Sequence, residues 1–84
     1  MAAILREMVT LRPGCPVRAV AVVEHAGVIL RGLKLEESQG RYFLSTPGRR
    51  LGGSWQVLYD LRPELADELL DLLLEEYSRR GGPA

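Results

Sequence analysis

The chain is poor in the residue types that build metal centres and nucleophilic sites. Among its 84 residues it has one cysteine, Cys15, and one histidine, His25. A single cysteine cannot form an internal disulfide or a CxxC metal pair, and a lone histidine cannot hold a metal ion. Cys15 lies in a proline-flanked loop with no histidine placed to activate it as a nucleophile. These absences predict no metal, no cofactor and a reducing compartment.

Long apolar runs and phosphate-binding loops are also missing. No stretch approaches the roughly 20 apolar residues needed to cross a bilayer, and Met1–Glu7 lacks the apolar core of a signal peptide. The sequence contains no GxxxxGKS/T loop. The carboxylates near the C-terminus fall at the spacing of a solvated helix face, where nothing raises their pKa for acid-base work. We therefore expect a cytoplasmic, non-enzymatic protein without a small-molecule substrate or a membrane contact.

Charge is balanced over the whole chain but divided along it. Residues 1 to 56 contain eight basic and four acidic residues, whereas residues 57 to 84 contain three and seven, so the two parts have net charges of +4 and −4. This division could orient the protein on a charged partner, or it could reflect a basic sheet beside an acidic helix. The length predicts a single domain, residues 1–84, and a domain this small gains core by associating with a second copy.

The first three quarters of the chain predict strands. Apolar and polar residues alternate in short runs that glycine, proline and polar turns separate. Both faces of the second run are partly apolar, so it should be central, and His25-Ala26-Gly27 should turn it into the third. The five predicted strands are Ala3–Leu11, Val17–Glu24, Val28–Leu35, Arg41–Thr46 and Trp55–Leu61.

The segment between the fourth and fifth strands combines a stop signal with positive charge. Pro47 has no amide proton to continue a central ladder, so the strand should end at Thr46. The glycine-rich stretch Gly48–Gly53 then reads as a flexible connection that carries Arg49 and Arg50. An anionic partner would be expected first at this loop.

The periodicity changes at Pro63, a residue favoured at the first position of a helix. Leucines then recur at three- and four-residue spacing opposite a row of carboxylates, until Gly81 ends the pattern. The apolar arc is wider than one sheet contact requires, and this suggests a second partner. The predicted fold class is α+β, with a small antiparallel meander of about five strands followed by one C-terminal amphipathic helix.

Four segments together resemble the SpoVG family, the bacterial septation and sporulation regulators. They are Val17–Ala21, Leu33–Leu35, Tyr42–Pro47 and Leu74–Arg79. The likeness runs from about Arg6 to Arg80. It implies a small sheet backed by one helix, a homodimer, and DNA or RNA binding with little sequence preference in a regulatory role. By the same resemblance, Arg49 and Arg50 match the family's basic pair after the proline, Arg18, Phe43 and Pro47 match structural positions, and Tyr77 and Arg79 match the helix end.

Two functional hypotheses follow. In the first, a dimeric regulator binds the phosphate backbone of nucleic acid through its basic residues. These are Arg18, Arg31, Lys34, Arg41, Arg49 and Arg50, with Arg79 and Arg80 as an extension. In the second, the leucine-rich helix face and an exposed sheet edge recruit a protein partner.

The large apolar side chains could either contact a ligand or pack in the core or a dimer interface. Either Tyr42 or Phe43 could stack on a base, because adjacent strand residues face opposite ways, but core packing is the commoner use of such residues. Trp55 is expected in the core or a dimer interface. The remaining residues expected there are Phe43, Tyr77, Leu72 and Leu74.

Overall fold

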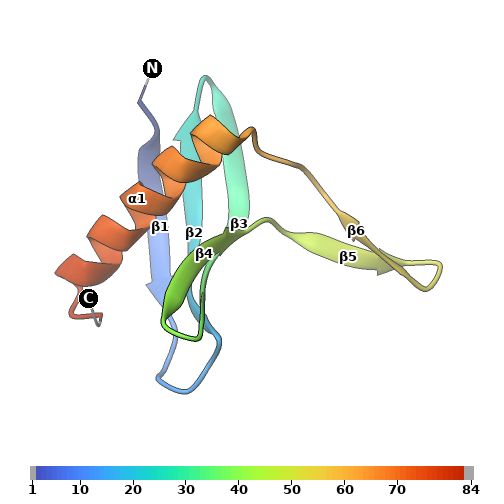
Figure 1. Ribbon diagram of the computed structural model, residues 1–84. Helices are drawn as coiled ribbons and strands as arrows, with labels where there is room; N and C mark the ends of the chain where they lie inside the picture. Colours follow the sequence, from blue (N-terminus) through green and yellow to red (C-terminus); the bar gives the residue numbers. More distant parts are fainter. Residues whose placement is uncertain (1, 83–84) are drawn as a thin grey trace.

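A single helix covers one face of an antiparallel sheet, and a separate hairpin projects from this body (Figure 1). The computed structural model describes residues 2–82. Its elements are β1 (Ile4–Thr10), β2 (Val17–His25), β3 (Val28–Ser38), β4 (Arg41–Ser45), β5 (Gly48–Leu51), β6 (Ser54–Val57) and α1 (Pro63–Arg79). Strands β1 to β4 pair in sequence order, and β5 pairs only with β6. The predicted α+β class is confirmed.

The core lies between the sheet and α1. Along β2, Ala19, Ala21 and Val23 are fully buried, because alternate residues of a strand point to the same face and this face is the one that α1 covers. Leu69 and Leu73 of the helix are fully buried against it. The predicted central position of β2, between β1 and β3, is confirmed. Burying a leucine side chain of this kind contributes about 2 kcal/mol.

The turn after β2 and the two ends of α1 follow local chemistry. The turn between β2 and β3 is the two-residue loop of Ala26 and Gly27, so the predicted hairpin is confirmed. The φ angles of these residues, 52° and 80°, are those of a type I′ turn. Helix α1 begins at Pro63, as predicted. It ends in a Schellman motif, in which Gly82 donates its backbone N–H to the carbonyl oxygen of Tyr77 at 3.0 Å and Gly81 has a φ of 87°.

Most of the leucine-rich face of α1 packs against the core of the same chain. Tyr77 is buried and Leu72 and Leu74 are half-buried against the core. The ring of Tyr77 also contacts Tyr42 of β4, with ring centroids 6.1 Å apart. Tyr42 is therefore a packing residue and does not form a free stacking surface. The wide apolar arc of α1 is accounted for by contacts across the sheet, since the helix packs against β1, β3 and β4.

The predicted five-stranded meander is wrong in its last strand. Residues 55 to 61 do not join the main sheet: only the first part forms β6, and β6 pairs with β5. The predicted flexible loop Gly48–Gly53 is itself β5 followed by a turn. Gly52 and Gly53 have φ angles of 59° and 84°, which a two-residue hairpin turn requires. Two glycines that suggested flexibility therefore fold the segment back on itself.

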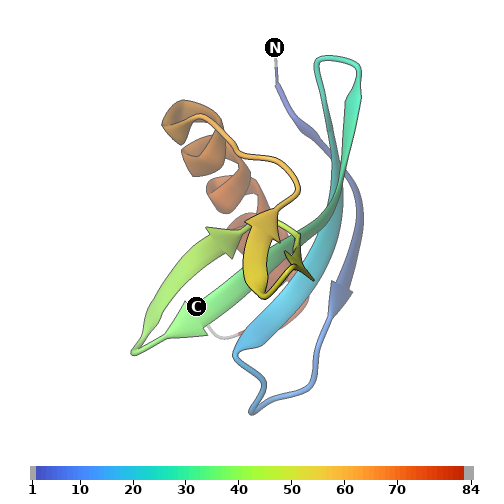
Figure 2. The ribbon, with the colours of Figure 1, turned by 90° about the vertical axis from the view of Figure 1, so that its right-hand side faces the viewer.

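The hairpin stands away from the sheet and helix, which Figure 2 shows end-on. We call residues 48–58 the arm. Its root is fixed at two points of β3. Pro47 packs over Gly32, where a Cβ would lie 3.3 Å from the Cβ of Pro47. The hydroxyl of Tyr59 donates to the carbonyl oxygen of Arg31 at 2.9 Å. The arm therefore leaves the sheet at a defined place.

The contact between Gly32 and Pro47 predicts a stability difference between two glycine substitutions. Gly32 and Gly27 have similar φ angles, 77° and 80°, but a Cβ on Gly27 would meet nothing within 4 Å. In each case alanine strains the backbone by about 1–2 kcal/mol. We expect Gly32→Ala to lower the free energy of unfolding further than Gly27→Ala, as measured by urea denaturation, because Pro47 must also shift. Equal decreases would show that the proline contact is unimportant.

Candidate nucleic-acid interface

The arm presents two arginines that have no ion-pair partner in the described part of the chain. In the β5–β6 register Arg50 lies opposite Trp55 and Arg49 opposite Gln56, so the two guanidinium groups lie on opposite faces of the hairpin. Residues 48–58 contain no aspartate or glutamate. Neither arginine forms an ion pair with any residue between 2 and 82. Both side chains are exposed and are available to an anionic partner.

Trp55 lies on the same face of the arm as Arg50. Its indole ring lies against Gly48: a Cβ on that glycine would be 2.6 Å from the indole Nε1 and 2.7 Å from Cε2. The residue is nevertheless 58% exposed. Trp55 was expected in the core or a dimer interface: the core alternative is wrong, and the dimer-interface alternative stays a prediction. Trp55 lies outside the core because β6 leaves the sheet, and the ring has only the hairpin's own backbone to pack against.

Two further predicted cations lie on β3, close in sequence to the root of the arm. Arg31 is exposed, and its carbonyl oxygen is the acceptor for Tyr59. Lys34 pairs in register with Ser45, two residues before Pro47. Neither Arg31 nor Lys34 has an acidic partner in the described part of the chain. The arm and its root therefore contain Arg31, Arg49 and Arg50, whereas the side chain of Lys34 lies on the sheet face opposite α1.

The other predicted cations lie elsewhere, and most are already paired. Arg18 forms a half-buried ion pair with Glu37, with 2.8 Å between Nη2 and Oε1. Arg41 is exposed at the start of β4, the end of that strand farther from the arm. It has no ion-pair partner among residues 2–82. Neither residue contributes to the group of cations around the arm.

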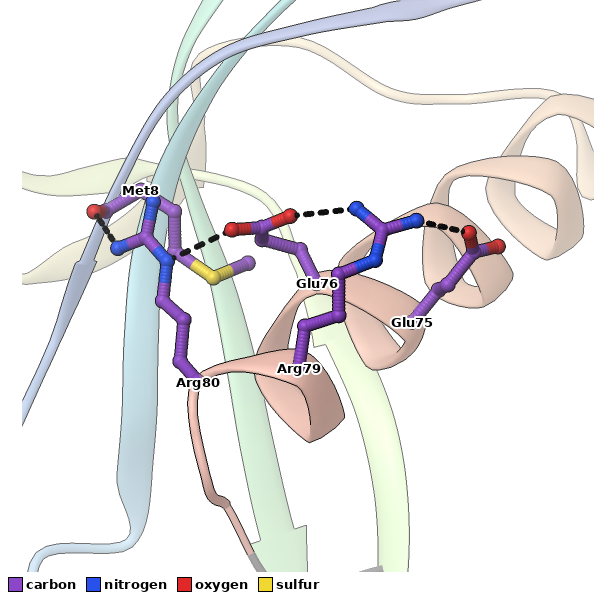
Figure 3. A network of polar contacts seen from close by, with 5 residues as sticks. All are labelled: Met8, Glu75, Glu76, Arg79 and Arg80. Carbon is purple, nitrogen blue, oxygen red and sulfur yellow. Dashed lines mark hydrogen bonds and ion pairs between the residues drawn. The ribbon is translucent and has the colours of Figure 1, made fainter.

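Arg79 and Arg80 form ion pairs and hydrogen bonds at the C-terminal end of α1 (Figure 3). Arg79 bonds to Glu75 and Glu76, and Arg80 bonds to Glu76 with 2.8 Å between Nε and Oε2. Arg80 also donates to the backbone carbonyl of Met8 in β1. The adjoining hollow of about 290 Å³ is lined by three arginines and three glutamates. This surface has no net charge to attract a phosphate backbone.

The sheet face opposite α1 is uncovered and partly apolar. Phe43 points to this side and is 42% exposed. Of the two places predicted for it, the core is therefore wrong and the dimer interface stays a prediction. Phe43 lies beside Glu36, its register partner on β3. We call this surface the open face, and by strand alternation its central residues are Glu7, Val9, Val20, Val22, Lys34, Glu36 and Phe43.

The described residues contain neither a metal-binding cluster nor a membrane-spanning helix. No group of three or more histidine, cysteine, aspartate or glutamate side chains within residues 2–82 could hold a metal ion. Over the same residues, no helix has the length and apolar character needed to span a membrane. Cys15 is half-buried and free. The arm remains the candidate site with the most distinctive chemistry.

The ion-pair network at the end of α1 predicts acid sensitivity. A hydrogen bond from Arg80, aided by the charges of Arg80 and Arg79, holds the pKa of Glu76 below its ordinary value of 4.5. Because the pKa is lower in the folded state, the stabilisation is present above about pH 4.5 and disappears as the pH falls through the folded-state pKa. We expect Glu76→Gln to flatten the fall in unfolding free energy between neutral and acid pH, measured by urea denaturation.

The matched control for Glu76→Gln is Asp71→Asn. Asp71 is an exposed carboxylate in the middle of the same helix and has no ion-pair partner among the described residues. Its substitution should leave the acid dependence close to that of the wild type. If Glu76→Gln and the wild type lose stability in parallel as the pH falls, the network does not cause the acid sensitivity.

Of the two features of the arm that the sequence interpretation missed, one has a sequence signal and the other has none. The hairpin could have been recognised from Gly52-Gly53 between two short runs that favour strands, which is a hairpin pattern. The support of Trp55 by Gly48 had no sequence signal, because it depends on the register of the hairpin.

Relatives do not supply a function for this site. Comparison of the chain with models of known protein families, with curated proteins and with solved structures finds no match in any of the three. The resemblance to the SpoVG family thus stays a prediction.

Proposed function

We propose that the protein is a non-enzymatic regulator that binds nucleic acid through the arm and its root. The observation that carries the proposal is the arm itself, a hairpin that projects from the body (Figure 1). It contains no carboxylate, and its two arginines have no ion-pair partner among residues 2–82. Guanidinium groups bind phosphate oxygens through paired, charge-assisted hydrogen bonds. The resemblance to the SpoVG family supports the same function independently.

The acidic helix does not oppose this proposal directly. The arm points away from α1 (Figure 1). Four of the helix-end charges, Glu75, Glu76, Arg79 and Arg80, are paired with one another. The net charge of the protein is zero, so attraction to phosphate is local to the arm and its root. Binding of this kind is weak and falls steeply as salt is added.

Removing the two arm arginines should reduce both affinity and salt dependence. For Arg49→Ala/Arg50→Ala we expect weaker binding to a fluorescent single-stranded oligonucleotide, measured by anisotropy at rising salt. The slope of log affinity against log salt should fall by about one for each phosphate that the variant no longer neutralises. Both side chains are exposed, so the fold should be retained, as circular dichroism can check.

The control removes the same amount of charge from another place. Arg12 and Arg62 lie outside the arm and have no ion-pair partner among residues 2–82. Arg12→Ala/Arg62→Ala should keep most of the affinity. If the two double variants weaken binding equally, or if the arm variant binds like the wild type, the arm is not the binding site.

A second proposal concerns the open face, which we assign to contact with a second copy of the chain. The chain exposes 5793 Å², whereas a compact monomer of 9.3 kDa exposes about 5,000 Å². The projecting arm, exposed throughout residues 49–58, and the uncovered open face both contribute to this excess. The open face carries both signs of charge, including the Arg6–Glu24 ion pair. A two-fold arrangement could therefore pair opposite charges around an apolar centre.

Dimerisation through the open face predicts a specific response to charge. Val9 is on this face and 52% exposed, so Val9→Glu should fold normally but dissociate the dimer. Val28 is similarly exposed, at 55%, but points to the other side of the sheet, and Val28→Glu should remain dimeric. Sedimentation equilibrium measures the molecular masses of the wild type, Val9→Glu and Val28→Glu. A monomeric wild type, or a dimeric Val9→Glu, would contradict the proposal.

A further inference from the structure

The most exposed large apolar residue in the described chain is Trp55, on the arm. We infer that its indole ring stacks on an unpaired base, and that the ligand of the arm is therefore single-stranded nucleic acid. This inference rests on the proposed function and adds a contact and a ligand class to it. Tryptophan is a largely buried residue in most proteins, so a tryptophan exposed on a projecting hairpin calls for a partner.

The hairpin holds the ring in place before any ligand arrives. Gly48 has no side chain, and the indole occupies the space that a Cβ would need. Trp55 has only two side-chain torsions to fix, and the glycine contact restricts them, so binding costs little conformational entropy. A ring that is supported on one side and exposed elsewhere is the form of a stacking platform for bases.

The charges around Trp55 match a nucleotide. Arg50 is its register partner on the same face of the hairpin, and Arg49 lies on the adjacent residue of β5. A base on the indole would therefore place a flanking phosphate beside the guanidinium group of Arg50, whereas Arg49 points to the opposite face of the hairpin. The other exposed aromatic residue differs in this respect: Phe43 has the carboxylate of Glu36 as its register partner, which repels a phosphate backbone.

A second arm is a poor partner for the indole. Two arms in contact would bring four arginines together, and residues 48–58 contain no carboxylate to balance them. Duplex nucleic acid is a poor partner for a different reason. Its bases are already stacked and paired, so an aromatic side chain reaches a base face only where the strand is single.

Trp55 is the only tryptophan in the chain, so its fluorescence reports on this site directly. The ligands are a deoxythymidine oligonucleotide and the duplex that it forms with its deoxyadenosine complement. We expect the single strand to quench the fluorescence in step with binding measured by anisotropy. Trp55→Ala should weaken single-strand binding about tenfold while leaving the salt slope and the duplex affinity unchanged. Trp55→Phe should restore most of the affinity.

Each contrary outcome points to a different error. If Trp55→Ala binds the single strand as tightly as the wild type and the indole is not quenched, stacking is wrong while binding through the arm stands. If neither oligonucleotide binds, the proposed function fails and this inference fails with it. If the free protein shows the blue-shifted emission of a buried indole, and this shifts to the red on dilution or in Val9→Glu, a second copy covers Trp55 and the inference is overturned.

Discussion

The contact between Pro47 and Gly32 determines the two-part design of the molecule. A bulge in β3 puts Gly32 at a φ of 77°, and the absence of a side chain there lets Pro47 lie directly on the strand. Proline also removes the amide that would have continued β4. The chain consequently turns out of the sheet after Ser45 and forms a separate hairpin. The separation of the arm from the sheet, and with it the exposure of the arm, follows from this exit.

The distribution of ion pairs explains how a neutral protein can have a basic element. Acidic residues are frequent in α1, but Glu75 and Glu76 are held by the arginines of the same helix end. The arm has cations only. Distance and solvent screening separate the two, since charges on an exposed surface interact little beyond about 10 Å at moderate salt. The division of charge along the sequence is thus partly a division in space.

Periodicity was sufficient to predict the body of the fold and insufficient to predict the arm. The alternation in β2, the turn at Ala26 and Gly27, and the helix that begins at Pro63 are each encoded by neighbouring residues, and each is confirmed. The sheet in which β6 pairs, by contrast, is not determined by the residues next to β6 in the sequence. Trp55 and Val57 alternate as strand residues do, but their partner strand depends on the turn at Gly52-Gly53 and on the exit at Pro47. Alternation identifies a strand without identifying the sheet that it joins.

The same limit applies to the candidate site. Arg49 and Arg50 were identified from their place after a proline, whereas Arg18, Arg79 and Arg80 have equal charge and no distinguishing pattern. Only the fold shows that these three have carboxylate partners. Trp55 was assigned to the core or a dimer interface because bulk predicts burial, yet burial requires a neighbouring element to supply the cover. A two-stranded hairpin with no helix over it has no such cover, so the side chain of Trp55 stays exposed. The excess of arginine over carboxylate in the arm is what favours a nucleotide as the proposed partner of Trp55.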